Sequence, residues 1–337
     1  IVYILNNKNI LTGITTTGTP HLGNYVGAIR PAIASSKEQS HDSFFFLADY
    51  HALIKSKDRD DMKKSCLEIA ATWIASGLNV DQTYFYRQSD IPEILELNWI
   101  LNNFTAKGLM NRAHAYKAAV DENETADPDK GITMGLFSYP VLMAADILMF
   151  KATHVPVGQD QIQHIEMTRD IAQRFNHHYG EIFVIPEGVI DKDSSVLPGL
   201  DGRKMSKSYG NLIPLFCDST TLRKYVMKIK TNSLEPGEPK STDECLLFDI
   251  YKSFASESQI SSMKNELENG MSWGDAKNEL YELLDGHLLE PRLKYDELIS
   301  NPLFLDHVLN EGAERARGIA SSNLVQIKKA IGLGKLS

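Results

Sequence analysis

Five short apolar segments in the first 190 residues constrain the fold of this 337-residue chain more than any other feature. They are rich in β-branched and aromatic residues and do not alternate cleanly with polar ones, which is typical of strands buried on both faces. They lie at residues 9–15, 43–53, 83–89, 153–158 and 183–190. Amphipathic helical stretches separate them, and this alternation predicts βαβ units in an α/β fold with a doubly wound parallel sheet.

Two of the separating stretches have clear helix boundaries. Residues 60–77 end at a glycine, and residues 160–180 have Asp160 near their start and a glycine at their end. Such residues satisfy backbone groups that a helix end leaves unpaired. Polar residues mixed with Pro and Gly predict surface loops at 121–131 and 191–211.

The pattern changes from about residue 217 onward, where helical periodicity continues without a convincing strand. Breaks containing Gly or Pro interrupt it at 235–239 and 268–274. This change predicts a smaller, all-helical domain after the sheet.

The composition excludes several classes of protein. No apolar run approaches the ~20 residues that span a bilayer, and no secretory signal is visible, so we expect no membrane attachment and a cytoplasmic location. Cys66, Cys217 and Cys245 are far apart and odd in number, which predicts neither a disulfide framework nor a zinc cluster. A net charge of −9 argues against coating of nucleic acid by bulk electrostatics, although it allows a local basic patch.

The first strand is followed by a turn that could bind phosphate. Residues 13–30 read GITTTGTPHLGNYVGAIR, so a helix is expected to start between Leu22 and Asn24, and Pro31 should end or kink it. Phosphates bind at helix N-termini, and His21 would add a donor here. Taken alone, the turn is more often structural, and it matches neither a Walker loop nor the usual dinucleotide pattern.

A second candidate is the loop DGRKMSKSYGN at residues 201–211, which places Arg203, Lys204 and Lys207 between two glycines of an acidic protein. A cationic loop with hydroxyl groups suits a polyanionic ligand. On composition alone, an ordinary solvated loop is the simpler interpretation.

Together, the two stretches resemble the paired signatures of class I aminoacyl-tRNA synthetases. TPHLGN at residues 19–24 is similar to the HIGH signature, and KMSKS at 204–208 is identical to the second one. They stand in the family's order, about 180 residues apart, on a βαβ scaffold. The resemblance implies a Rossmann-like catalytic domain that binds the phosphates of ATP. It assigns catalytic roles to His21, Asn24, Lys204 and Lys207.

The stretch YPVLMAADIL at residues 139–148 indicates the amino acid that such an enzyme would use. Tyr139, Met143 and Asp146 share one helical face, and a carboxylate between apolar residues should be buried and should need a partner. Tyr139 and Met143 could equally be core residues. The pattern resembles tryptophanyl-tRNA synthetases, in which this Asp accepts the indole N–H and the Met packs on the ring. The tyrosyl enzymes carry Gln at the Met position.

Residues 155–166, VPVGQDQIQHIE, also resemble the tryptophanyl pattern, which implies that Gln161 meets the polar end of tryptophan. Two departures are Thr15, where many bacterial relatives have Gln, and Asn24, where the signature ends in His. No acidic cluster predicts a fixed metal site, so Mg²⁺ should arrive with ATP. The ATP contacts that the resemblance implies are Thr15, Thr16, Thr17, Gly23, Asn24, Gly158, Gln159, Asp160, Val196, Lys204, Met205, Ser206, Lys207 and Ser208.

The resemblance covers essentially the whole chain and implies its organisation. It places a catalytic domain at 1–205, an anticodon-binding helical domain at 206–298, and C-terminal helices that pack back on the catalytic domain at 299–337. It also implies a homodimer that binds L-tryptophan, ATP and tRNA(Trp). Each basic run is more often a solvated helix face, but those near the acceptor end or on the helical domain could contact RNA. They contain Lys107, Arg112, His114, Lys117, Arg223, Lys224 and Lys228.

We therefore expect an ATP-dependent, AMP-forming enzyme that joins tryptophan to its tRNA. A tyrosyl enzyme is the nearest alternative, and Met143 disfavours it. A nucleotidylyltransferase acting on a small acid would lack the KMSKS loop followed by a large helical domain. A non-enzymatic tRNA-binding relative would show decayed signatures. Asp49, which ends a predicted strand, and His51 could belong either to the site or to the core.

Overall fold

The computed structural model describes residues 8–38, 41–123, 127–190, 197–206 and 209–334. Its centre is a five-stranded, entirely parallel sheet with the order β3-β2-β1-β4-β5. The strands are β1 (Lys8–Ile14), β2 (His41–Leu47), β3 (Tyr84–Arg87), β4 (His154–Pro156) and β5 (Glu187–Val189). The order reverses between β1 and β4, which confirms the predicted doubly wound sheet. Ligands of such sheets bind at the carboxyl ends of the strands, beside the reversal.

The central strand β2 shows why its sequence does not alternate. Phe44 and Phe46 belong to the apolar cluster on one face of the sheet, whereas Phe45 and Leu47 belong to the cluster on the other. Successive side chains of a strand point to opposite faces, so a strand covered on both sides is apolar throughout. The outer strand β5 differs, because all three of its residues are exposed. The prediction of burial on both faces is therefore wrong for β5.

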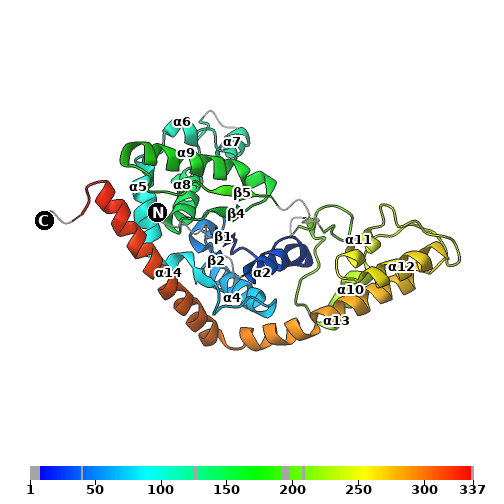
Figure 1. Cartoon of the computed structure of the whole chain (residues 1–337). Helices are drawn as coiled ribbons and strands as arrows, with labels where there is room; N and C mark the ends of the chain where they lie inside the picture. Colours follow the sequence, from blue (N-terminus) through cyan, green and yellow to red (C-terminus); the bar gives the residue numbers. More distant parts are fainter. Residues whose placement is uncertain (1–7, 39–40, 124–126, 191–196, 207–208, 335–337) are drawn as a thin grey trace, which may run out of the picture.

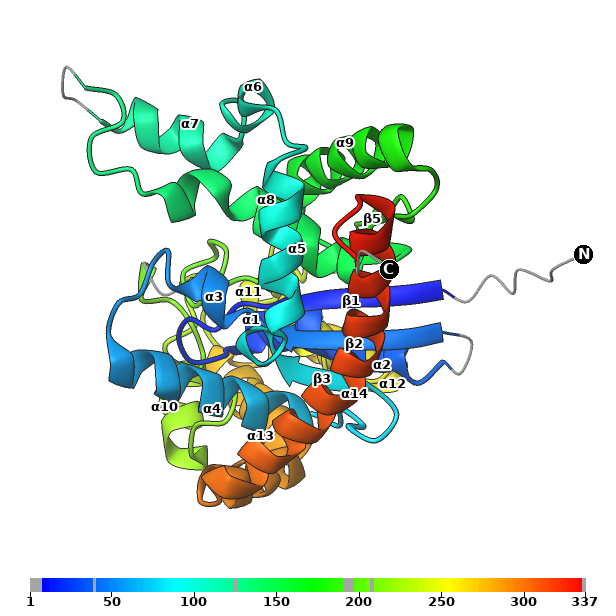
Figure 2. The same ribbon diagram turned by 90° about the vertical axis from the view of Figure 1, so that its left-hand side faces the viewer.

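Helices cover the sheet and extend well beyond it (Figures 1 and 2). The α-helices are α1 (Leu22–Asn24), α2 (Arg30–Ser36), α3 (Asp49–Ala52), α4 (Arg59–Ala75), α5 (Pro92–Asn102), α6 (Lys107–Met110), α7 (His114–Asp121), α8 (Met134–Met149), α9 (Ile162–Tyr179), α10 (Ser219–Met227), α11 (Leu246–Lys252), α12 (Glu257–Glu268), α13 (Trp273–Ile299) and α14 (Pro302–Ala330). A π-helix η1 (Tyr25–Ile29) and two 3₁₀ turns, η2 (Gln88–Asp90) and η3 (Gln159–Gln161), complete the set.

Two predicted elements need correction. The strand expected at 43–53 is too long, because β2 ends at Leu47 and Asp49 begins α3 instead of ending a strand. The helix expected at 160–180 begins as the 3₁₀ turn η3 and continues as α9. It ends before Gly180, whose φ of 87° lies in the left-handed region that glycine adopts readily.

Pro31 does not end the first helix, because the helical path continues through it into α2. The helical path widens into η1 before it, and Arg30 N–H donates to Tyr25 O, five residues back. Pro31 then lies in the first turn of α2, where its missing N–H is tolerated. The π-turn is the local adjustment that lets the helix continue through the proline.

The long helix α14 covers the sheet at β3, the strand at one edge, and crosses it in Figure 2. A Cβ on Gly312 would lie 1.9 Å from Phe85 O, so the helix approaches the strand backbone more closely than any other residue would allow. Arg315 adds hydrogen bonds to the carbonyls of Val80 (2.6 Å) and Thr83 (2.8 Å) just before β3. An edge strand that would otherwise be open is thereby covered.

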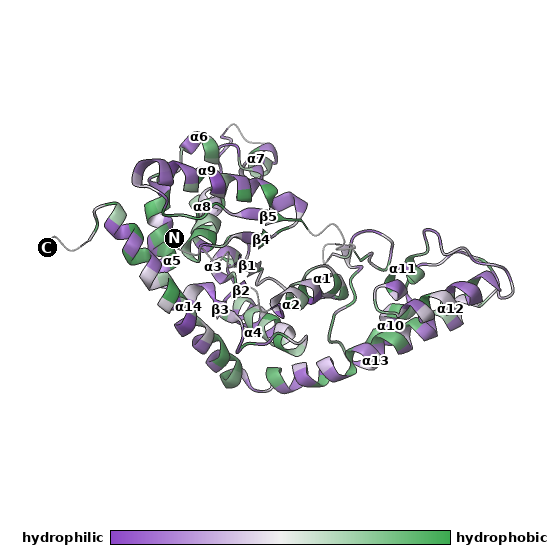
Figure 3. Cartoon of the chain, in the orientation of Figure 1, coloured by the Kyte–Doolittle hydropathy of each residue, from purple (hydrophilic) through white to green (hydrophobic). Residues whose placement is uncertain are grey.

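The helices α10 to α13 form a group that extends away from the sheet in Figure 1. Their apolar residues gather where the helices meet, as Figure 3 shows, and Leu222, Ile250 and Leu284 are completely buried there. No strand follows β5 in the described residues, which agrees with the predicted helical part. The predicted domain boundaries at residues 205 and 298 stay predictions. Within the described ranges, no helix has the length and apolar character needed to cross a membrane.

Substitution of Gly312 by Ala should lower the free energy of unfolding by about 1–3 kcal/mol, because the added methyl group forces α14 away from β3. The control is Gly318→Ala on the same helix, where an added Cβ meets nothing within 4 Å. That change should raise the free energy by about 0.5–1 kcal/mol. Urea unfolding curves of the two variants test this. Equal effects of the two would contradict the close approach.

Candidate active site

The turn after β1 carries the first signature, and its side chains cap each other. His21 precedes the helix that begins at Leu22, and its Nδ1 accepts the backbone N–H of Asn24 at 3.3 Å. In return, Asn24 Oδ1 accepts the backbone N–H of His21 at 3.1 Å. This reciprocal capping box fixes the two side chains. Because Nδ1 accepts a hydrogen bond, a neutral His21 ring carries its proton on Nε2.

A segment that follows the KMSKS stretch at residues 204–208, called the lysine loop below, pairs with this turn through the backbone. Leu22 N–H donates to Ile213 O at 3.0 Å, and Leu215 N–H donates to Pro20 O at 3.1 Å. The pairing is antiparallel and lies on either side of His21. It joins parts of the chain that are almost 200 residues apart.

The lysine loop itself also reaches the first turn. A Cβ on Gly23 would lie 3.4 Å from Met205 Cβ, so the two signatures are in contact. Met205 is only 4% exposed and belongs to the core cluster, whereas Lys204 is exposed. The Met205 side chain therefore anchors the loop, and an ATP contact at this position would involve its backbone alone. Three predicted contacts, Val196, Lys207 and Ser208, lie outside the described residues.

Asp146 on α8 has the buried position that the sequence predicts, with 1% of its side chain exposed. Gln88 Nε2 donates to Asp146 Oδ1 at 2.8 Å and to Oδ2 at 2.9 Å, and His51 Nε2 donates to Oδ2 at 2.9 Å. A carboxylate oxygen has two acceptor positions, so one position on Oδ1 remains. Burial raises the pKa of Asp146 above its usual value, and the hydrogen bond from His51 opposes that rise.

The two partners of Asp146 come from the carboxyl ends of neighbouring strands. His51 lies in α3, directly after β2, and Gln88 begins the 3₁₀ turn after β3. His51 was an open candidate in the sequence, and the structure places it in the site. Gln88 was missed because a lone Gln before a turn carries no recognisable signal. Its side chain is completely buried, and its Oε1 atom has no hydrogen-bond partner among the residues that the structure describes.

Asp49, the other candidate near this strand end, has a structural role. Its Oδ1 accepts the backbone N–H groups of Tyr50 and Ser89 (both 3.0 Å), and its Oδ2 accepts the hydroxyl of Ser89. Burial raises the pKa of this carboxyl, while the hydrogen bonds from Ser89 lower it. Asp49 thus fixes the turn that carries Gln88.

The other two residues predicted on the face of Asp146 are partly buried beside it. The Tyr139 hydroxyl lies 2.7 Å from His164 Nε2, and the Tyr139 ring meets the edge of the His51 ring at a centroid distance of 6.3 Å. Burial, together with the charge of Asp160, raises the pKa of Tyr139 to about 12. Met143 packs against the apolar cluster on this side of the sheet. Half-buried aromatic and thioether groups beside a carboxylate suit a flat, apolar ligand with a polar edge.

The remaining predicted contacts lie on turns at the same edge of the sheet. Gly158 to Gln161 are exposed between β4 and α9. Thr15 and Thr17 are exposed after β1. Thr16 is 1% exposed and its hydroxyl donates to Ala48 O at 3.4 Å, so its side chain is structural and an ATP contact there would involve the backbone.

The residues predicted to contact RNA are all exposed, as an RNA surface requires and as a solvated helix face would also show. Several are engaged locally: Lys107 lies over the Phe137 ring, and Arg223 donates to Asn278 Oδ1 at 3.0 Å. Arg112 lines a groove of about 690 Å³ between α6 and α9, opposite Arg174. Lys107, Arg112, His114 and Lys117 lie close in sequence on α6, on α7 and on the short connection between them. The structure keeps Arg223, Lys224 and Lys228 apart from them, at α10.

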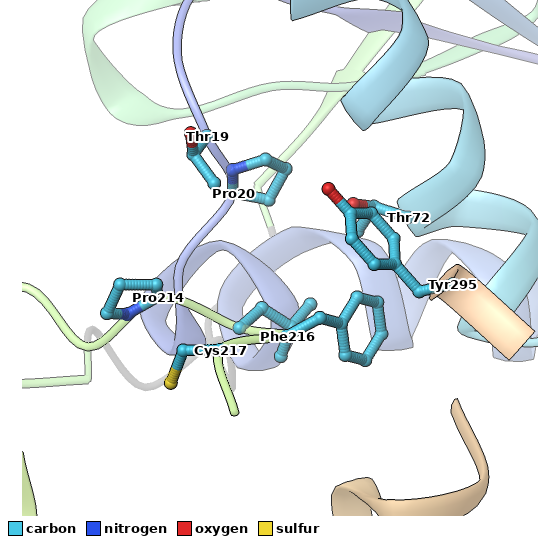
Figure 4. Close-up of a pocket in the computed structure, with 8 residues that line it drawn as sticks. Thr19, Pro20, Thr72, Pro214, Phe216, Cys217 and Tyr295 are labelled. Carbon is cyan, nitrogen blue, oxygen red and sulfur yellow. The ribbon is translucent and has the colours of Figure 1, made fainter. Parts of the chain in front are cut away.

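A cavity of about 130 Å³ lies behind the first signature turn (Figure 4). Its walls come from the turn, from Thr72 of α4, from the segment that pairs with the turn, and from Tyr295 of α13. None of the predicted ATP or tryptophan contacts lines it, so it is separate from the substrate site. Across the described ranges, no group of three or more His, Cys, Asp or Glu side chains is arranged to hold a metal ion.

The raised pKa of Asp146 makes a prediction about stability and pH. A carboxyl whose pKa is higher in the folded state favours folding below its usual value of 3.8, and that contribution is lost as the pH rises through the raised pKa. Asp146→Asn should therefore gain stability relative to the wild type at pH 7, and the gain should shrink at pH 4. Urea unfolding at both pH values measures this, with the exposed Asp170→Asn as the control for charge. A variant that is less stable at pH 7, by the same margin as at pH 4, would contradict it.

Comparisons with known proteins agree with the geometry. The sequence model of the family described as tRNA synthetases class I (W and Y) matches residues 6–288. The tryptophan–tRNA ligase of Pseudomonas aeruginosa is 58% identical over 97% of this chain and 74% of its own length. That of Neisseria meningitidis is 54% identical over 98% of this chain and 100% of its own.

Solved structures give the same result. The tryptophanyl-tRNA synthetase of Campylobacter jejuni, complexed with ADP and tryptophan, superposes with a TM-score of 0.89 at 41% identity. The match covers 96% of this chain and 100% of that one. The paired signatures and the buried Asp146 therefore have a common explanation: the chain belongs to the class I tRNA synthetases of the tryptophanyl and tyrosyl family, and within it to the bacterial tryptophan–tRNA ligases.

Proposed function

We propose that this chain activates L-tryptophan with ATP, which gives tryptophanyl-adenylate and pyrophosphate, and then transfers tryptophan to the terminal adenosine of tRNA(Trp). The observation that carries the proposal is the buried carboxylate of Asp146. Two fixed donors, from His51 and Gln88, leave one acceptor position on Oδ1. The partners of Asp146 follow β2 and β3, and the first signature follows β1, so all of them lie at the carboxyl edge of the sheet. The second signature contacts the first at Gly23.

In the first step an oxygen of the tryptophan carboxylate forms a bond to the α-phosphorus of ATP. The bond from that phosphorus to the bridging oxygen breaks, and pyrophosphate leaves with the electron pair. The attacking group is already ionised at neutral pH, so no general base is needed. What the reaction needs is alignment and neutralisation of the charge on the leaving group.

Lys204 and Lys207 would neutralise the pyrophosphate, with Ser206, Ser208 and backbone N–H groups of their loop as hydrogen-bond donors. The Nε2–H group of His21 and the side-chain amide of Asn24 would hold the phosphates from the facing turn. Mg²⁺ enters this scheme as part of the ATP substrate. Gly158, Gln159 and Asp160 would meet the nucleotide.

Selection of tryptophan would depend on Asp146. The free position on its Oδ1 suits the indole N–H, while Tyr139 and Met143 pack beside the ring and Gln161 meets the polar end of the substrate. Phenylalanine has no N–H, so it would leave a buried acceptor unpaired. A site of this kind discriminates by roughly 10⁴-fold or more. Tyrosine would be excluded by its shape.

In the second step the terminal ribose hydroxyl of tRNA attacks the carbonyl carbon of the adenylate, and AMP is released. The exposed cations of α6 and α7 would contact the acceptor end, and those of α10 the anticodon side, if each helix meets RNA as the family pattern implies. We further propose that the chain works as a homodimer in the cytoplasm.

Tryptophan should be the amino acid that drives ATP–pyrophosphate exchange, and Asp146→Ala should lower that exchange by about 10- to 100-fold. The reason is loss of one hydrogen bond to a charged group, worth roughly 1.5–3 kcal/mol. Asp170→Ala, which removes an exposed carboxylate from α9, is the control and should have wild-type activity. Exchange driven by tyrosine would show that Met143 has been misinterpreted. No exchange with any amino acid would rule out the proposal.

The RNA contacts make a separate prediction. Lys117→Ala and Lys224→Ala should each raise the KM for tRNA about 2- to 10-fold and leave tryptophan-dependent exchange unchanged, since each removes a phosphate contact and no substrate contact. In a plot of the logarithm of tRNA affinity against the logarithm of salt concentration, the slope should become shallower by about 0.7–0.9 for each contact removed. Lys264→Ala, an exposed lysine of α12 that pairs with Glu268, is the control. An unchanged slope would place the RNA elsewhere.

A further inference from the structure

Asn211 is a buried amide that none of the roles above uses. It follows the lysine loop, and only 3% of its side chain is exposed. Its Oδ1 accepts the backbone N–H of Ser206 at 2.8 Å. Its Nδ2 donates to Asp201 Oδ1 at 2.6 Å, to Lys204 O at 3.2 Å and to Arg203 O at 3.5 Å. One side chain thus holds Lys204 and Ser206 of the loop, and Asp201 and Arg203 of the turn before it.

Only an amide meets all of these groups. Ser206 offers a donor, whereas Asp201, Arg203 and Lys204 offer acceptors, so the side chain must both accept and donate. An aspartate would place a second negative oxygen against Asp201 and two carbonyls. A leucine of similar size could make none of these four hydrogen bonds. The hydrogen bond from Asn211, followed by those from Arg203, lowers the pKa of Asp201 to about 2, so the acceptor that faces the amide is ionised at neutral pH.

The neighbouring backbone is shaped around this amide. A Cβ on Gly199 would lie 2.3 Å from Asn211 Nδ2, so no other residue at 199 leaves room for the side chain. Gly199 N–H donates to Arg203 O at 2.7 Å, and Leu200 N–H donates to Asn211 O at 2.9 Å. The turn before the lysine loop and the residue after it therefore form one unit, with the amide inside.

Asn211 also stands between the loop and the part of the chain that is fixed to the first signature. Two residues later, Ile213 O accepts the N–H of Leu22 in the backbone pairing with the first turn. Asn211 thus links Lys204 to the segment that is paired with the first turn. Two other contacts also hold this part of the loop: Met205 lies against Gly23 of the same turn, and Lys204 forms an antiparallel bridge with Pro198.

We propose that Asn211 is a positioning residue that holds the backbone of Lys204 to Ser206 in the orientation from which the loop meets the phosphates of ATP. The inference rests on the proposed function, in which this loop binds ATP. Asn211 touches no substrate, and it acts through the loop. Its loss should therefore affect ATP and the chemical step, and leave the tryptophan site intact.

The test compares Asn211→Leu and the isosteric Asn211→Asp with a matched control, Asn176→Leu. Asn176 is also buried, and it organises the turn at Phe183 by donating to Phe183 O (2.8 Å) and accepting from Phe183 N (2.9 Å). Three experiments are made on each full-length variant, and they give the following quantities. They are kcat and the two KM values of tryptophan-dependent ATP–pyrophosphate exchange, the Kd for ATP without tryptophan and for tryptophan without ATP by equilibrium dialysis, and the urea midpoint.

We expect both Asn211 variants to lower kcat by about 100-fold and to raise the Kd for ATP by about 10-fold, because a misplacement of about 1 Å has effects of this size. The Kd for tryptophan should change less than about twofold. Asn176→Leu should lower the urea midpoint and leave kcat and both Kd values near those of the wild type. Should one Asn211 variant fail to fold, the other decides the result.

Three outcomes would overturn the inference: unchanged kcat and ATP affinity in folded Asn211 variants, an equal loss of affinity for tryptophan, or the same loss of activity in Asn176→Leu. Failure of the proposed function would look different. A wild-type chain that binds ATP but shows exchange with no amino acid would refute the ligase activity. The dialysis of ATP with the Asn211 variants would still decide their positioning role. A wild-type chain that does not bind ATP would overturn both.

Discussion

Backbone hydrogen bonds between residues 20–22 and 213–215 hold the active site together. The phosphate-facing turn belongs to the first βα connection, and the lysine loop follows the last strand. This pairing sets the position of the first turn relative to the segment that follows the lysine loop. Leu22 and Met205 belong to the same core cluster, so apolar burial accompanies the pairing. A short contact between residues far apart in the sequence thus sets the relative position of the two signatures.

A different constraint shapes the tryptophan side of the site, where a carboxylate has to be stabilised away from water. Asp146 is buried, and burying a carboxylate is unfavourable unless donors meet it. His51 and Gln88 supply three hydrogen bonds, and the strand ends that carry them are themselves fixed by Asp49. Within the described part of the chain, the carboxylate keeps one acceptor position that these two donors do not fill. This incompletely paired oxygen faces the place where the proposed ligand carries an N–H. A cost in stability at a binding site of this kind is common in proteins, because binding and stability compete.

Much of this could be predicted from the sequence. The five strands, their parallel arrangement and the helical second part follow from hydrophobic patterning, and the signatures follow from local residue identity. The burial of Asp146 followed from its apolar neighbours. The predictions fail where the determining interaction is not local: Gln88 and Asn211 gain their roles from partners that only the tertiary structure brings close. The backbone pairing at Leu22 leaves no trace in side-chain pattern. Thr16 and Met205 resemble ligand contacts in sequence, yet the turn directs their side chains into the core.

The cover that α14 provides for β3 has a consequence during synthesis. About 200 residues separate β3 from α14, so at roughly 5–20 residues per second the ribosome makes the strand some 10–40 s before the helix. Through that interval β3 has an open edge, with unpaired N–H and C=O groups that can recruit another strand. The nascent chain therefore passes through a stage at which aggregation competes with folding. The time for which the edge of β3 stays open depends on the speed of translation. Slower decoding between these two elements would lengthen that stage without altering the finished protein.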